Sequence, residues 1–151
     1  MALRTIRTVE DEVLRKKCRP VEEVNDRIRE LLKDMADTMY YTENGAGLAA
    51  PQVGILKRLV VIDMGDGLVN LINPEIMDRK GTQEVIEGCL SIPGKWGKVI
   101  RPAEVTVRAL NEKGEEVLIK GAKDMAKCLC HEIDHLDGIL FIDKVTEYIK
   151  D

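Results

Sequence analysis

Both histidines of this chain lie in one short stretch, His131-Glu-Ile-Asp-His135, and their spacing is the first indication of chemistry. Residues four apart stand on the same face of an α-helix, about 40° apart around its axis. Two neutral imidazoles placed in this way can bind one divalent, zinc-like ion. Glu132 lies about 100° round the helix from His131, so it can reach a water on the ion rather than the ion itself. The alternative interpretation is a solvated acidic helix face that carries two surface imidazoles.

Two further stretches contain residues that could bind a metal or a substrate. The segment from Gly45 to Gln52 consists of small, uncharged residues and ends in one amide side chain. Its glycines leave the backbone free for close approach by another group, although a tight turn against the core would need them too. The segment Glu87-Gly-Cys-Leu-Ser91 places Cys89 directly after a glycine. The four cysteines of the chain are sparse and irregularly spaced, which indicates reduced thiols or a metal ligand rather than a disulfide framework.

Together, these three stretches resemble the peptide deformylase family, in which they occur in this order and with this spacing. Residues 11–21 and 136–143 also look like the family's flanking segments, so the resemblance covers nearly the whole chain. It implies an α+β fold, with antiparallel strands packed around a central helix that carries the histidines and with an N-terminal helix. The implied activity is removal of the N-formyl group from the formylmethionine of newly synthesised bacterial proteins, with release of formate.

The resemblance also implies three ligands for one divalent metal ion: the thiolate of Cys89 and the imidazoles of His131 and His135. Such a set leaves the fourth tetrahedral position open for water, as in catalytic rather than structural zinc sites. Intrinsic affinity favours zinc over iron(II). The resemblance nevertheless implies iron(II), with nickel or cobalt as working substitutes.

The implied reaction uses water that the ion activates near neutral pH, with Glu132 as general base and then general acid. The oxyanion needs neutral donors, and the Gln52 side-chain amide and the Leu90 backbone N–H are expected to supply them. An extended substrate peptide is expected to pair with the backbone of the glycine stretch, as strand addition requires. The substrate-binding residues implied are Gly45, Ala46, Gly47, Glu87 and Cys128. For Cys128, a small buried hydrophobe is an equally good interpretation.

A helix must present the two histidines, and the pattern predicts one from about residue 123 to 136, with Gly138 as its stop signal. A second helix is predicted from about 22 to 42, ended by Asn44-Gly45, after a short turn within residues 10–18. Strands are predicted at 58–64, 68–72, 84–90, 104–110 and 116–120, the last two forming a hairpin. Asn73-Pro74 should end the second strand, and residues 95–101 should be irregular.

Length and charge limit the classes of function. At 151 residues with 44% hydrophobic side chains, residues 1–151 should form a single catalytic domain with one core. The 23 basic and 27 acidic side chains give a net charge of −4, and no basic run favours direct nucleic-acid binding. The sequence contains neither an apolar run long enough for a membrane span nor a signal-peptide core, so a cytoplasmic location is expected. The expected partners are N-formylmethionyl peptides, with at most transient contact with the ribosome.

Two features differ from the usual pattern of the family. Cys130 stands directly before His131, where the family most often has glutamine, and its predicted face points away from the ion. Only eight residues follow Asp143. The long C-terminal helix with which some relatives dock on the ribosome is therefore not expected, nor is stable docking.

Three other functions compete with this interpretation. A metalloprotease would need a third His or Glu ligand downstream of the motif, where only Glu147 remains. A structural metal site made of Cys128, Cys130 and the two histidines would need Cys130 to share the ion, although it points about 100° away from His131. A thiol hydrolase that pairs Cys89 with a histidine stays open, and loss of activity on chelation would exclude it.

Overall fold

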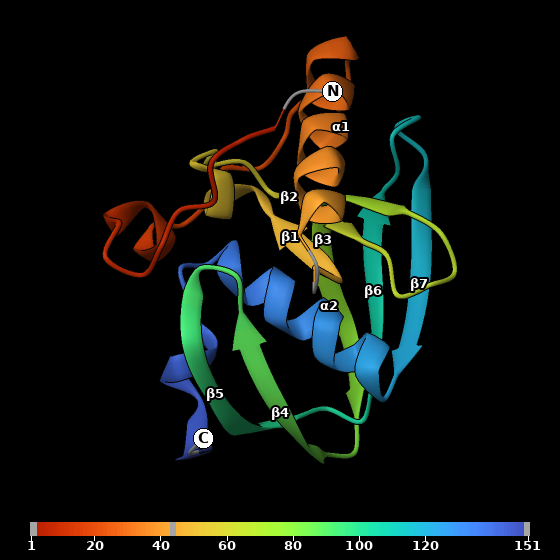
Figure 1. The fold of residues 1–151 in the computed structure, drawn as a ribbon. Helices are drawn as coiled ribbons and strands as arrows, with labels where there is room; N and C mark the ends of the chain where they lie inside the picture. Colours follow the sequence, from red (N-terminus) through yellow and green to blue (C-terminus); the bar gives the residue numbers. More distant parts are fainter. Residues whose placement is uncertain (1–2, 43–44, 150–151) are drawn as a thin grey trace.

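The computed structural model describes residues 3–42 and 45–149, which form two antiparallel sheets and two α-helices (Figure 1). The larger sheet has the order β1-β2-β3-β6-β7, and the smaller sheet has the order β4-β5-β8. The strands are β1 (Gly47–Ala49), β2 (Leu59–Ile62), β3 (Val69–Lys80), β4 (Gln83–Cys89), β5 (Ile92–Arg101), β6 (Glu104–Leu110), β7 (Glu116–Ala122) and β8 (Val145–Tyr148). The helices are α1 (Asp26–Tyr41) and α2 (Asp124–His135), with short 3-10 helices at Glu12–Arg15, Ala50–Val53 and Phe141–Asp143. The expected α+β fold is confirmed.

The larger sheet is covered by a helix on each face, which explains the uninterrupted apolar run of β2. Successive side chains of a strand point to opposite faces. Leu59 and Val61 pack with α1, whereas Val60 and Ile62 pack with α2, and all four are fully buried. A strand between two helices is therefore apolar at every position. Figure 1 shows α2, in blue, crossing the middle of the molecule between the larger sheet and the hairpin of β4 and β5.

The N-terminal helix begins four residues later than the apolar pattern predicts. Asn25 is its N-cap, and its side-chain oxygen accepts a hydrogen bond of 3.1 Å from the backbone N–H of Ile28. This bond satisfies one of the free donors at the helix start, so the helix begins at Asp26 rather than at residue 22.

Gly45 does not end α1 in the way expected, because its backbone is not left-handed. The helix ends at Tyr41 with Thr42 in an extended conformation. Asn44, the other predicted stop residue, lies outside the described residues. A side chain at position 45 would collide with the Met39 carbonyl and the Thr42 hydroxyl, so space rather than backbone freedom requires glycine here.

The expectation that Asn73-Pro74 ends a strand is wrong, because β3 continues to Lys80. The pairing of β3 with β6 shifts register between Ile72 and Glu75, and Asn73 has a φ of 53° within this bulge. The Asn73 side chain accepts a hydrogen bond from the Val21 N–H and donates one to the Val21 carbonyl, both at 2.8 Å. The bulge accommodates the proline without a break in the sheet.

The expectation that residues 95–101 are irregular is also wrong, because they belong to β5, which pairs with both β4 and β8. The inward positions near its end are Gly97, Val99 and Arg101, all buried. A glycine and an arginine at inward positions hide the apolar alternation by which a strand is recognised. The short strand β8 was not predicted. The hairpin of β6 and β7 is confirmed.

The motif helix α2 runs from Asp124 to His135, close to its predicted bounds. Gly138 ends it with a φ of 73°, and a Cβ there would lie 2.5 Å from the Arg15 carbonyl oxygen. Arg58, beside β2, donates a hydrogen bond of 3.1 Å to the Leu136 carbonyl at the helix end. These contacts fix the helix that presents the histidines. Neither described α-helix is long and apolar enough to cross a membrane.

Candidate metal centre

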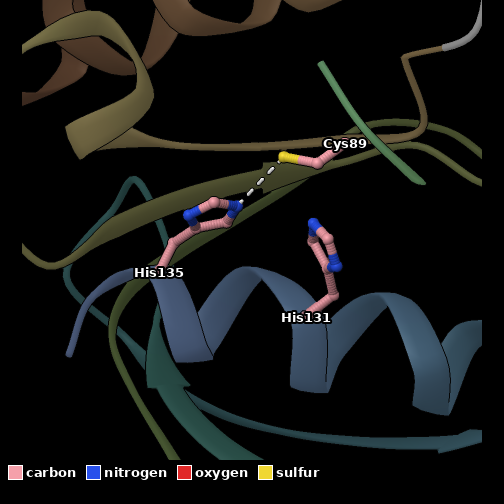
Figure 2. Close-up of side chains that lie close together, drawn as sticks. All are labelled: Cys89, His131 and His135. Atoms are coloured by element: carbon pink, nitrogen blue, oxygen red, sulfur yellow. Dashed lines mark hydrogen bonds between the residues drawn. The ribbon is translucent and has the colours of Figure 1, made fainter. Parts of the chain in front are cut away.

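Cys89, the last residue of β4, lies opposite the two histidines of α2 (Figure 2). Its Sγ atom is 3.4 Å from His135 Nε2, and one ligand atom from each of Cys89, His131 and His135 lies within 4.8 Å of the others. At ordinary bond lengths, tetrahedral coordination places a sulfur and a nitrogen ligand about 3.5 Å apart. The three side chains therefore fit one divalent ion.

Glu87, two residues before Cys89 on β4, orients one of the two imidazoles. Its Oε1 atom lies 2.7 Å from His131 Nδ1, which leaves Nε2 directed toward Cys89. Burial lowers the pKa of His131, but hydrogen bonds with Cys89 and Glu87 outweigh burial and raise this pKa to about 10. The negative groups that hold the extra proton would equally favour a metal cation in its place.

Arg101, at the end of β5, joins the hairpin to the motif helix. Its Nε and Nη2 atoms donate to the two oxygens of Glu87 at 2.6 and 2.8 Å, and Nη1 donates to Asp134 of α2 at 2.7 Å. Burial raises the pKa of Glu87, but the bonds from Arg101 and His131 dominate and bring it to about 2. A single guanidinium therefore ties the strand that carries the thiol to the helix that carries the imidazoles.

His135 has a different environment from His131. Burial lowers the pKa of His135 well below its ordinary value, so the ring is neutral, as a metal ligand must be. Its Nδ1 atom has no hydrogen-bond partner among the residues that the structure describes. Its Nε2 atom, which faces Cys89, is therefore the one available to an ion.

Glu132 follows His131 on α2 and lines the same site. The side chain is buried, and Oε1 makes no hydrogen bond within the described part of the chain. Burial raises the pKa of Glu132 to about 7, against the opposing charge of His131. A carboxylate with such a pKa can take up and return a proton near neutral pH. A Cβ on Gly47 would lie 2.9 Å from Glu132 Oε2, so glycine is required for this carboxylate to fit.

The Gln52 amide is held in a fixed orientation. Its Oε1 atom accepts a hydrogen bond of 2.9 Å from the Ala49 N–H. This bond turns Nε2 toward the site, where it donates to the Ser91 hydroxyl at 3.2 Å and lies 3.6 Å from Cys89 Sγ. An amide donor thus points at the ligand cluster without being able to rotate freely.

A cavity of about 390 Å³ is lined by Gln52, Glu87, Cys89, His131 and Glu132. We call its buried end the floor; it comprises Gln52, Cys89, His131 and Glu132, together with His135, whose Nε2 atom faces Cys89. We call its exposed end the rim; it comprises Met64, Ile86 and Trp96. The cavity wall also includes the predicted residues Gly45, Ala46, Gly47, Gln52, Leu90 and Cys128.

The structure brings all of the predicted site residues to the cavity or to the ligand cluster. Glu87, expected to bind substrate, lines the cavity, and both of its oxygens bond to Arg101 or His131. Cys130 lies in the core beneath α2, where burial raises the pKa of its thiol, and it does not join the ligand cluster.

Four residues of this region were not singled out from the sequence: Ser91, Trp96, Arg101 and Asp134. Asp134 lies inside the histidine motif and Ser91 inside the cysteine motif, so their positions were visible although their partners were not. Arg101 would have been found if residues 92–101 had been recognised as a strand. Trp96 carried one signal, since it is the single tryptophan of the chain.

Comparison with known proteins gives consistent matches over the whole chain. The family model described as polypeptide deformylase matches residues 3–150. Peptide deformylase 2 of Clostridium acetobutylicum is 64% identical over 150 residues, which cover 99% of this chain and 100% of that protein. Peptide deformylase of Acetivibrio thermocellus is 60% identical over 100% of this chain and 88% of its own length. The crystal structure of peptide deformylase from Thermotoga maritima has a TM-score of 0.93 and 39% identity, and covers 97% of this chain and 99% of that one.

Proposed function

The chain belongs to the polypeptide deformylase family of metalloenzymes, which remove the N-formyl group from nascent peptides, and we propose that residues 1–151 form one catalytic domain that does so with the residues of the cavity floor. The supporting observation is the convergence there of three ligand side chains, one unpartnered carboxylate and one oriented amide. These are the groups that hydrolysis of an amide requires.

Cys89, His131 and His135 would hold the metal ion, and we assign iron(II) to it, with zinc, nickel or cobalt as alternatives. When bound, a divalent ion polarises a carbonyl group and makes water a nucleophile near neutral pH. Glu87 accepts the Nδ1 proton of His131 and so keeps Nε2 free for the ion. Arg101 holds Glu87 in place.

Glu132 would act as the proton carrier. Its Oε1 atom, which has no partner within the described residues, takes a proton from the attacking water. The same oxygen then delivers this proton to the departing amine, which becomes the free N-terminus of the peptide. The amine leaves as the C–N bond to the formyl carbon breaks, and the formyl carbon departs as formate.

Two neutral donors would stabilise the oxyanion that forms on the formyl oxygen. The Gln52 side-chain amide is already directed toward the ligand cluster by its bond from Ala49. The Leu90 backbone N–H is the second donor, on the turn directly after Cys89. A donor that needs no reorientation contributes about 3–4 kcal/mol to such a transition state.

The substrate would enter as an extended peptide beside β1. β1 is an edge strand of the larger sheet, and the backbone of Gly45, Ala46 and Gly47 lines the cavity. Backbone pairing along this edge positions the formyl group over the floor. The methionine side chain then lies against Cys128, whose thiol is buried at the cavity wall. N-formylmethionyl chains of the cytoplasm, met in transient contact with the ribosome, are the proposed partners.

The test is formate release from formyl-Met-Ala-Ser under anaerobic conditions, with metal analysis of the same sample. We expect activity from the iron(II)-loaded protein, loss of activity on chelation, and recovery with iron(II), nickel or cobalt. Activity that survives complete removal of metal would overturn the proposal and favour a thiol hydrolase based on Cys89.

A further inference from the structure

The two imidazoles of the ligand cluster are held in different ways. Glu87 lies 2.7 Å from His131 Nδ1 and fixes that ring through its side chain. The Nδ1 atom of His135, which Figure 2 shows directed away from Cys89, has no hydrogen-bond partner among the residues of the two described ranges. A metal-binding imidazole normally has its second ring nitrogen held by a hydrogen bond. Apart from packing against the His131 ring, the orientation of His135 must therefore come from the main chain that carries it.

His135 is the last residue of α2, at the point where the chain leaves the helix. Leu136 is the C-cap, and Gly138 follows with a φ of 73°. The last carbonyl groups of a helix have no partners within it, so groups from elsewhere must bond them. The position of His135 therefore depends on what bonds the residues directly after it.

Arg58 bonds this helix end. Its Nη1 atom donates to the Leu136 carbonyl at 3.1 Å and to Asp137 Oδ1 at 3.0 Å. The same Leu136 carbonyl accepts a hydrogen bond of 2.8 Å from the Cys18 N–H. Only 16% of the Arg58 side chain is exposed, so its guanidinium is largely withdrawn from water. A cation at this place also complements the negative end of the helix dipole.

The main chain of Arg58 is itself fixed in the larger sheet. Its N–H donates to the Arg19 carbonyl at 3.0 Å, and its carbonyl accepts from the Asn73 N–H at 2.8 Å. Arg58 directly precedes β2, the strand that packs against both helices. Arg58 therefore ties α2 to the larger sheet, just as Arg101 ties α2 to the smaller one.

Arg15 also reaches this end of α2, but less directly. Its Nη1 atom donates to the Gly138 carbonyl at 3.3 Å, and its side chain is 45% exposed. An exposed arginine contributes little to holding a neighbouring segment, because water competes for its bonds. Arg58, with shorter bonds closer to His135, is the better support.

We propose that Arg58 is a positioning residue for metal binding: through the Leu136 carbonyl and Asp137, it holds the end of α2 so that His135 Nε2 stays directed at the ion. This inference rests on the proposed function, because it concerns the ion which that function requires. It adds a second support to the site, one that acts through the main chain rather than through the ring.

The first experiment uses the zinc-loaded protein, labelled with nitrogen-15. The chain has only two histidines, so NMR spectra of imidazole nitrogens should contain just two ring patterns. Arg58→Met should displace the His135 pattern and leave that of His131 in place, whereas Glu87→Gln should do the reverse. In the same Arg58→Met sample, zinc affinity measured by chelator competition should fall by about 10-fold. Arg58→Lys keeps the charge but not the fork of donors, so its affinity should stay within about threefold of the unmodified protein.

Arg4→Met is the matched control. Arg4 donates two hydrogen bonds to Asp34 of α1, at 3.2 and 3.0 Å, and its side chain is 30% exposed. It is thus a partly buried arginine that holds the other helix. Its loss should lower stability without displacing either imidazole pattern.

Each outcome supports or overturns the inference. An unchanged His135 pattern in Arg58→Met, or equal displacement of both patterns, would overturn it. If Arg58→Met does not fold, Arg58→Lys and Asp137→Asn take its place, and both should displace the His135 pattern alone, by a smaller amount. No displacement in either variant would overturn the inference. An unmodified protein that does not bind zinc through both imidazoles would instead overturn the proposed function.

Discussion

The floor and the rim of the cavity are built by opposite means. At the floor, polar and charged side chains are buried, and the residues that support them are paired: Arg101 and Glu87 are each 2% exposed and joined by two hydrogen bonds. At the rim, large apolar side chains are exposed and make no specific bonds. Buried charges depend strongly on their partners, whereas exposed apolar groups can be exchanged at little cost. The floor should therefore determine whether the reaction occurs, and the rim which peptides undergo it.

The largest effect is expected for Glu132→Gln. The substitution keeps the shape of the side chain but removes the proton acceptor, so kcat should fall by about 1,000-fold or more, with metal content unchanged. Metal analysis and kinetics on the same sample provide the check. Loss of the metal would mean that Glu132 is a ligand rather than a proton carrier.

Gln52→Leu should have the next largest effect on catalysis. It removes the amide that is fixed by Ala49, so kcat should fall by about 100- to 1,000-fold while KM changes little. An unfolding curve of the variant tests whether the loss of the bond to Ala49 also lowers stability. A kcat equal to that of the unmodified protein would show that the Gln52 amide does not stabilise the transition state.

Arg101→Met tests whether the floor depends on its buried partners. Glu87 would remain buried without its counter-ion, so stability should fall by about 3–5 kcal/mol. His131 would be less firmly oriented, so metal affinity should fall by about 10- to 100-fold. Chelator competition and chemical unfolding measure the two effects separately.

The double variant Arg101→Met with Glu87→Gln is the matched control for the ion pair of Arg101 and Glu87. It removes both charges, so it should recover part of the lost stability but not the metal affinity. Full metal affinity in Arg101→Met alone would show that the Arg101–Glu87 ion pair does not help to orient the metal ligands.

The smallest effect is expected at the rim, for Ile86→Ala. This side chain is about half exposed, so its removal should raise KM for a peptide with phenylalanine after alanine by about threefold. The value of kcat should stay within twofold, because no group at the floor is touched. A kcat loss comparable to that of Gln52→Leu would erase the distinction between the two regions.

The sequence predicts the floor far better than its supports. His131, Glu132 and His135 lie in one motif whose spacing expresses helix geometry, whereas Cys89 and Gln52 could be named because their motifs resemble those of the peptide deformylase family. Arg101 could not be, because its partners lie on another strand and on the helix, and no local pattern encodes such a pairing.

The fold shows the same division between local and long-range information. α2 and the β6–β7 hairpin follow local periodicity and were predicted within a few residues. The predicted end of β3 was too early, because the bulge at Asn73 is stabilised by Val21, which is distant in the sequence. β5 was missed because its inward positions include Gly97 and Arg101, whose presence reflects tertiary packing and ion pairing rather than apolar burial.

The shortness of β1 has a consequence for how the protein behaves at high concentration. An open strand edge can pair with any extended chain, including another copy of the same protein, and long open edges favour aggregation. β1 offers only the three residues Gly47–Ala49, and Pro51 just beyond supplies no N–H with which to extend the ladder. So short an edge cannot hold a second folded molecule, yet it suffices for the flexible end of a peptide that needs only two or three backbone bonds.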